Sequence, residues 1–148
     1  MPLPELPEGA VEIGAVVADW RSAVRLSGHV LERSGAATPA YADEMVRMIE
    51  EHGPYVVIAP GLALAHARPG PAVLADGLAI VTLAEPVNFG HPHNDPVSVV
   101  LGLAIKSSDA HHAAVAELAN VFNDSNAIQA LAAASTVAEV QSIMGGNK

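Results

Sequence analysis

The stretch VSVVLGLAIKSSDAHH, residues 97–112, decides the fold class of this chain. Residues 97–105 are apolar almost without interruption, which is typical of a strand buried on both faces of a sheet. Ser107, Ser108 and Asp109 follow, and all three are residue types that cap helix N-termini. The stretch therefore predicts a central strand that leads directly into a helix.

Further strands and helices flank this unit in the sequence. Short apolar runs bounded by Gly and Pro predict the other strands, at residues 55–58, 62–65, 77–83 and 87–89. Helical spacing or richness in Ala predicts the helices, at residues 15–34, 38–52, 109–123, 125–134 and 136–144. Helices before, between and after buried strands predict an α/β fold: a single mixed β-sheet of about five strands covered by helices on both faces.

Length and composition limit the class of protein. The 148 residues predict one domain, residues 1–148, in which residues 1–10, with three prolines, are a loose lead-in. The net charge of −9 argues against nucleic acid or an anionic membrane surface as a direct partner. The chain has no cysteine, no signal-peptide pattern and no apolar run of membrane-spanning length. We therefore expect a cytoplasmic protein without direct membrane insertion.

Two histidines and an arginine stand where predicted strands end. The segment APGLALAHARPGPAV, residues 59–73, places His66 at a strand exit and Arg68 two residues later. His111 lies in the first turn of the helix that follows the central strand, on the same face as Leu118, whereas His112 lies about 100° further round. Each of these residues also has an ordinary structural interpretation. A first-turn histidine can simply make a local hydrogen bond, and a loop side chain can simply be solvated.

Together His66, Arg68 and His111 are suited to hold one small anion. Ligand crevices of α/β folds form at the carboxyl ends of strands, and a helix N-terminus favours an anion and lowers the pKa of a nearby imidazole. An imidazole can act as a nucleophile, and a guanidinium matches phosphate oxygens. The sequence contains neither a phosphate-binding Gly-rich loop ending in Lys nor an obvious magnesium-binding carboxylate cluster. The pattern predicts a protein that carries a phosphoryl group without activating a nucleotide.

Two long segments resemble a known family. These are GPYVVIAPGLALAHARPGPAV, residues 53–73, and GLAIVTLAEPVNFGHPHNDPVSVVLGLAIKSSDAHHAAVAELANVF, residues 77–122. They resemble the type-2 enzyme IIA domains of the bacterial phosphotransferase system, most of all the ascorbate branch, with the mannitol and fructose IIA domains as relatives. The resemblance runs from about Thr38 to Phe122 and is weaker toward both ends.

The resemblance implies partners and residue roles. In the family, the segment Gly-x-x-x-Pro-His-Ala-Arg-Pro carries the histidine phosphorylated by the phosphocarrier HPr, which implies His66 as the phospho-acceptor. The phosphoryl group then passes to a IIB component and, with the membrane IIC component, to the sugar, for which the resemblance implies ascorbate or another pentitol-like or sugar-acid substrate. The family's second active-site histidine opens a His-x-x-x-(Ile/Val)-x-x-Leu helix, which fits His111 and not His112. The implied activity is that of a phosphotransferase that works through phosphohistidine and needs no cofactor or metal.

The chain departs from the family pattern at two places. Ala65 stands where most members have proline, which affects the local backbone but removes no reacting atom. Some relatives carry an arginine late in the helix before the first of these strands; here Met48 falls near that position, with Arg47 beside it. We therefore expect Arg68, rather than Arg47, to stabilise the phosphoryl group.

Two other functions fit parts of the sequence. The same histidines would serve a regulatory IIA-like module, whose phosphorylation state controls a partner protein instead of supplying a transporter. His91, His93 and Asp95 could supply imidazole and carboxylate ligands to a metal ion, although histidines in such a polar loop are more often solvated. We expect no metal there.

Overall fold

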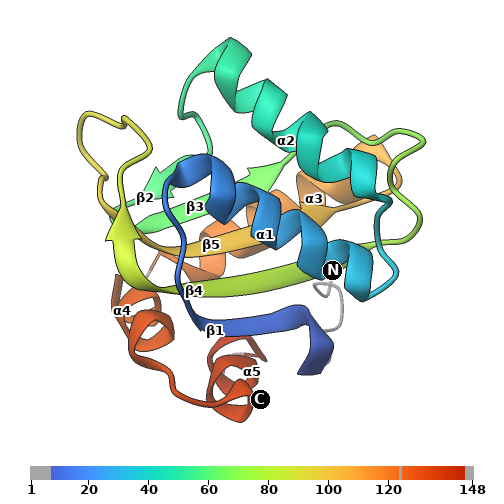
Figure 1. The fold of residues 1–148 in the computed structure, drawn as a ribbon. Helices are drawn as coiled ribbons and strands as arrows, with labels where there is room; N and C mark the ends of the chain where they lie inside the picture. The colour runs from blue at the N-terminus through green and yellow to red at the C-terminus, as the bar shows by residue number, and fades with distance from the viewer. Residues whose placement is uncertain (1–7, 124, 146–148) are drawn as a thin grey trace.

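The computed structural model describes residues 8–123 and 125–145, whose strands form one mixed sheet in the order β1-β4-β5-β3-β2 (Figure 1). The strands are β1 (Val11–Ala15), β2 (Val57–Ala59), β3 (Leu62–His66), β4 (Gly77–Val87) and β5 (Val97–Ala104). β1 runs parallel to β4 and β3 parallel to β5, whereas the β4–β5 and β2–β3 pairs are antiparallel. The predicted α/β fold with one mixed sheet is therefore confirmed.

Helices cover both faces of this sheet (Figure 1). They are α1 (Trp20–Arg33), α2 (Pro39–His52), α3 (Ser108–Val121), α4 (Ser125–Ala133) and α5 (Val137–Gly145), and a 3-10 turn, η1 (Glu8–Ala10), precedes β1. None of the helices in the described ranges is long and apolar enough to cross a membrane.

The two faces of the sheet have different side chains, because neighbouring residues of a strand point to opposite sides. On β3, Ala63 and Ala65 belong to the core under α1 and α2, whereas Leu62 and Leu64 belong to the core under α3, α4 and α5. Small residues on the α1 side allow helices and sheet to approach closely. At Gly28 of α1 an added Cβ would lie 2.5 Å from the Cβ of Ala42 on α2.

The N-terminal part of the sequence prediction is wrong in three respects. Residues 11–15 form β1, where the sequence predicts no strand and a helix that begins at residue 15. Within the expected loose segment 1–10, residues 8–10 form η1 and Ala10 is buried, while residues 1–7 lie outside the described residues. The first helix begins at Trp20 rather than at residue 15, because the Asp19 side chain accepts a hydrogen bond from the Ser22 amide and caps it there.

The strand register brings two chain exits together at one edge of the sheet. His66, the last residue of β3, pairs with Leu103 near the end of β5, and Gly77 at the start of β4 pairs with Ala104. The chain leaves β5 and enters α3 within a few residues. Carboxyl ends of neighbouring strands followed by a helix N-terminus form the crevice in which α/β folds bind ligands.

Candidate active site

His66 is held in one orientation by the strand that carries it. Its Nδ1 lies 2.8 Å from the carbonyl oxygen of Leu64. A carbonyl only accepts hydrogen bonds, so Nδ1 carries the proton and the lone pair of the neutral ring is on Nε2. Burial lowers the pKa of His66, and the bond to Leu64 opposes part of this shift. The ring is therefore neutral at pH 7, with Nε2 as its nucleophilic atom.

His111 faces His66 from the first turn of α3. The two ring centroids are 5.2 Å apart and the ring planes are inclined at 48°. Ser107 caps the helix by accepting a hydrogen bond from the Ala110 amide at 3.2 Å. Burial lowers the pKa of His111, and His66 and then His112 lower it further. The sequence predicts a lowered imidazole pKa from the helix N-terminus, and burial lowers the pKa of His111 in the same direction.

Arg68 brings a permanent positive charge to the same place. Its exposed side chain lines an open depression of about 420 Å³ together with His66 and His111. Burial raises the pKa of the Tyr55 hydroxyl, and the charge of Arg68 acts in the opposite direction. All three residues singled out in the sequence thus line one depression.

Other residues line this depression that the sequence does not predict there. They are Met48, Tyr55, Ala67, Pro69, Ser108 and His112, of which Met48 and His112 were considered in the sequence analysis. His112 was expected to face away from this place, and it lines the depression all the same. The Tyr55 ring stands nearly perpendicular to that of His66, with centroids 5.6 Å apart, and its hydroxyl donates to the His66 carbonyl oxygen at 3.5 Å. The rings of Tyr55 and His111 therefore both lie next to the ring of His66.

Arg47 lies outside this depression but beside it. It lines an adjoining hollow of about 210 Å³ on α2, and Met48, Ala67 and Arg68 line both hollows. Met48, which falls near the position of an arginine in some relatives, thus lines the same depression as the two histidines. Arg68 lines this depression as well.

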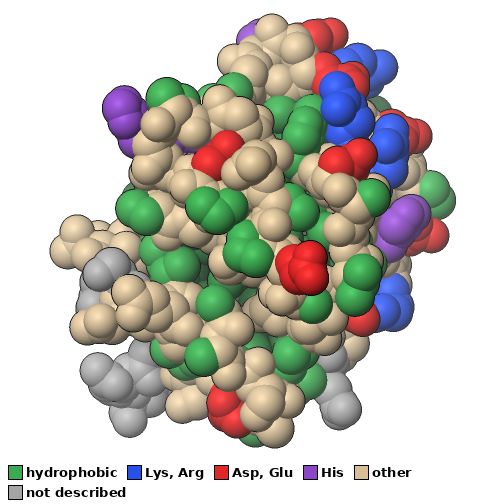
Figure 2. Space-filling model, turned by 60° about the vertical axis from the view of Figure 1, so that its left-hand side comes forward, with side chains coloured by type: hydrophobic (Ala, Val, Ile, Leu, Met, Phe, Trp, Pro, Cys, Tyr) green, Lys and Arg blue, Asp and Glu red, His purple; other side chains and the backbone are tan. Residues whose placement is uncertain are grey.

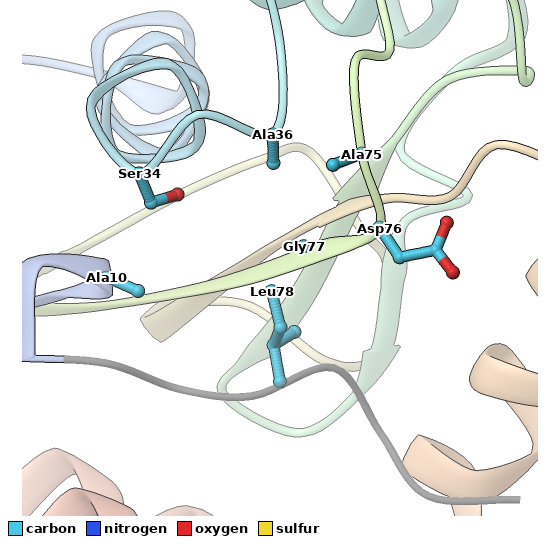
Figure 3. A pocket seen from close by; sticks show the side chains of 7 residues that line it. All are labelled: Ala10, Ser34, Ala36, Ala75, Asp76, Gly77 and Leu78. Carbon is cyan, nitrogen blue, oxygen red and sulfur yellow. The ribbon is translucent and has the colours of Figure 1, made fainter.

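A third hollow lies at the starts of β1 and β4 (Figure 3). Alanine and glycine provide most of its lining, and Figure 3 shows the Asp76 carboxylate turned to the side away from Ala10. One oxygen of that carboxylate accepts the Lys106 amide at 2.9 Å. Among the described residues that line this hollow, none has a nucleophilic side chain comparable to the imidazole of His66.

In the loop that contains His91, His93 and Asp95, the side chains of His91 and Asp95 accept hydrogen bonds from backbone amides of the loop itself. The Asp95 carboxylate accepts hydrogen bonds from the amides of Phe89, Gly90 and His91, and His91 Nδ1 accepts from those of His93 and Asn94. Within the described ranges, no three His, Asp or Glu side chains are arranged to hold a metal ion.

Comparisons with known proteins agree on one family. The model of the phosphoenolpyruvate-dependent sugar phosphotransferase system, EIIA 2, matches residues 6–145. The ascorbate-specific PTS system EIIA component of Shigella boydii serotype 4 (strain Sb227) is 33% identical over 132 residues, covering 88% of this chain and 86% of that protein.

Solved structures give the same result for the fold. A putative PTS IIA domain from Streptococcus pyogenes M1 GAS superposes with a TM-score of 0.87 at 34% identity, covering 98% of this chain and 95% of that one. Enzyme IIAMTL from Escherichia coli, solved in complex with phosphorylated enzyme IIBMTL, superposes with a TM-score of 0.87 at 24% identity, covering 98% and 100%.

Proposed function

Because this chain belongs to the EIIA type 2 family of the phosphoenolpyruvate-dependent sugar phosphotransferase system, we propose that it carries the phosphoryl group of that system on Nε2 of His66. The observation that carries this proposal is the His66–His111 pair. One ring is fixed through Nδ1 to the Leu64 carbonyl, and the other lies with its centroid 5.2 Å away in the same open depression.

The first step is transfer from a phosphohistidine donor, the phosphocarrier HPr. The Nε2 lone pair of His66 forms a bond to phosphorus while the phosphorus–nitrogen bond of the donor breaks in line, and the donor imidazole keeps that electron pair. The donor phosphoramidate is already activated, so no nucleotide is needed. Positive charge that develops on the His66 ring is stabilised by the Leu64 carbonyl, which accepts the Nδ1 proton in a hydrogen bond.

The transferring group is negatively charged, and its surroundings supply hydrogen-bond donors. A neutral His111 offers one N–H, and Arg68 offers a planar set of donors on the same depression. Ser108, the first residue of α3, also lines it, so the positive end of the helix dipole is near. We assign phosphoryl stabilisation to His111 and Arg68, and no metal or cofactor to this step.

The acceptor is a IIB component, which hands the phosphoryl group on to a sugar during uptake through a membrane IIC component. The complex of enzyme IIAMTL with phosphorylated enzyme IIBMTL supports a IIB partner for this chain. The ascorbate-specific relatives support ascorbate or a similar sugar acid as the transported compound. We place this relay in the cytoplasm, with the chain itself as one domain.

Intact-mass analysis tests the proposal. After incubation with phosphoenolpyruvate, enzyme I and HPr, the wild-type protein is expected to gain one acid-labile phosphoryl group and His66→Ala none. His111→Ala is expected to be labelled slowly and to pass the group on poorly. If the wild-type protein gains no mass while HPr itself is phosphorylated, the carrier function is wrong.

A further inference from the structure

We propose that Tyr41 is a positioning residue whose buried hydroxyl fixes the two histidine-bearing chain segments relative to each other. This inference deepens the proposed function and rests on it for its catalytic meaning. The geometry itself can be tested without phosphorylation.

The Tyr41 side chain reaches the strand exits from the first turn of α2 and is fully buried, with 0% exposure. Its hydroxyl donates a hydrogen bond to the Leu103 carbonyl at 2.7 Å and accepts one from the Ala67 amide at 3.0 Å. Burial also raises the pKa of Tyr41 to about 12, so the hydroxyl keeps its proton, and remains a donor, over the working pH range.

These two partners belong to the segments that carry the histidines. Ala67 directly follows His66, and Leu103 is the residue that pairs with His66 at the end of the β3–β5 ladder. From Leu103 the chain passes through Ile105 to Ser107, the cap of the helix that presents His111. Beyond the last ladder pair the segments diverge, and the Tyr41 hydroxyl bridges them where a further backbone pair would otherwise stand.

Removal of this hydroxyl leaves a buried amide and a buried carbonyl without their partner. Such groups move toward other partners or admit water, because an unpaired buried polar group is unfavourable. Either response changes the direction in which the chain leaves β3 and β5, and with it the spacing of the two imidazole rings. Transfer rates are sensitive to such changes, since a displacement of about 1 Å can lower a rate by about a hundredfold.

Tyr41→Phe tests this with a matched control. Thr82 also has a buried hydroxyl that holds two chain segments together, since Oγ1 accepts the Gly14 amide at 2.9 Å between β4 and β1. Thr82→Val removes that bond without touching the strand exits. At saturating phospho-HPr we expect Tyr41→Phe to slow the single-turnover transfer rate by about tenfold, with little change in the phospho-HPr concentration that gives half the maximal rate. We expect Thr82→Val to keep the wild-type rate.

Nitrogen NMR of the imidazole rings distinguishes a positioning role from simple core filling. If Tyr41 only filled the core, loss of its hydroxyl would leave the ring-nitrogen signals of the two histidines unchanged. In the unphosphorylated wild-type protein and in Thr82→Val, His66 is expected as a single Nδ1–H tautomer. In Tyr41→Phe we expect shifted or broadened signals from both His66 and His111. Unchanged signals together with an unchanged rate would show that Tyr41 only fills the core, and the proposal would be wrong.

Hydrogen exchange of the wild-type protein keeps the test independent of how the variant folds. The Ala67 amide is expected to be protected to a similar degree as amides within β3, because it is bonded to the Tyr41 hydroxyl. Rapid exchange at Ala67 would overturn the proposal. If HPr fails to label the wild-type protein, the carrier function fails, while the NMR and exchange results still decide whether Tyr41 fixes the exits.

Discussion

The hydrogen bond between His66 Nδ1 and the Leu64 carbonyl determines which nitrogen of His66 can react. Both residues belong to β3, with one residue between them along the strand. It places the proton on Nδ1 and the lone pair on Nε2, while burial keeps the ring neutral. A nucleophilic imidazole therefore needs no general base in this site.

The pH dependence of labelling follows from the lowered pKa values of His66 and His111. Both lie below the ordinary value of 6.5, so both rings are neutral above that pH. We expect the rate of phosphorylation to be constant from pH 7 to 8 and to fall below pH 6.5, as protonation removes the His66 lone pair. Stopped-flow measurements at a fixed concentration of phosphorylated HPr give this rate at each pH. The titration of phosphorylated HPr alone over the same pH range is the control. A rate that rises on acidification would contradict the assignment.

Stability should change with pH for the same reason. Because the folded-state pKa values are lowered, the unfolded chain binds more protons below pH 6.5. The stabilising contribution is complete above 6.5 and is lost as the pH falls through the folded-state values. We expect the double variant His66→Gln/His111→Gln to lose less unfolding free energy between pH 7 and 5 than the wild-type protein. Urea denaturation at each pH measures the unfolding free energy. The same loss of unfolding free energy between pH 7 and 5 in both proteins would refute the prediction.

At the scale of elements, the central unit could be predicted and the N-terminal strand could not. β5 and α3 follow from a long apolar run and a group of capping residues. β1 is only five residues long, and its bond from the Gly14 amide to Thr82 Oγ1 spans 68 residues, which no local pattern reveals. The capping residue Asp19 was present as a signal for the start of α1, but the apolar spacing before it favoured an earlier start.

The candidate site shows the same division. His66, Arg68 and His111 follow directly from strand exits and a helix start. Met48 and Tyr55 reach the depression from α2 and from the segment before β2, so their presence depends on how these elements pack around β3. Such contacts are fixed by the tertiary fold and not by sequence spacing.

The contact between α1 and α2 leads to a prediction about packing. An added Cβ at Gly28 would lie 2.5 Å from the Ala42 Cβ and 2.8 Å from its Cα, so the helices must separate. We expect Gly28→Ala to lower the unfolding free energy by about 1–3 kcal/mol. Gly9→Ala is the control, since nothing lies within 4 Å of its added Cβ. Equal stability of the two variants in urea denaturation would contradict the close packing.

Charged side chains are unevenly arranged on the face of the molecule that Figure 2 shows. Figure 2 shows acidic and basic side chains side by side along one margin, and a middle region in which separate hydrophobic side chains and isolated acidic groups lie among other atoms. Arg21 pairs with Glu50 at 2.8 Å and Arg25 with Asp43 at 3.5 Å, across α1 and α2. Arg68, by contrast, lines the depression of His66. Positive charge thus lies at the proposed phosphoryl site of a chain whose net charge is −9.

This net charge predicts how donor encounter depends on salt. A strongly acidic protein attracts a partner with a basic docking face, and salt screens the attraction. We expect the second-order rate of phosphorylation to fall by about tenfold between roughly 0.05 and 0.5 M salt, and the single-turnover rate at saturation to change little. A second-order rate that is constant or increases with salt would show that docking does not rely on charge.

The central claim is that Nε2 of His66 carries the phosphoryl group, and NMR of the phosphorylated protein tests it most directly. Nitrogen-15 labelling of histidine, with phosphorus coupling observed on the ring nitrogens, identifies both the residue and the atom. We predict coupling to Nε2 of His66, with Nδ1 still protonated and bonded to the Leu64 carbonyl. Phosphorus on Nδ1 of His66, or on His111, would contradict the account.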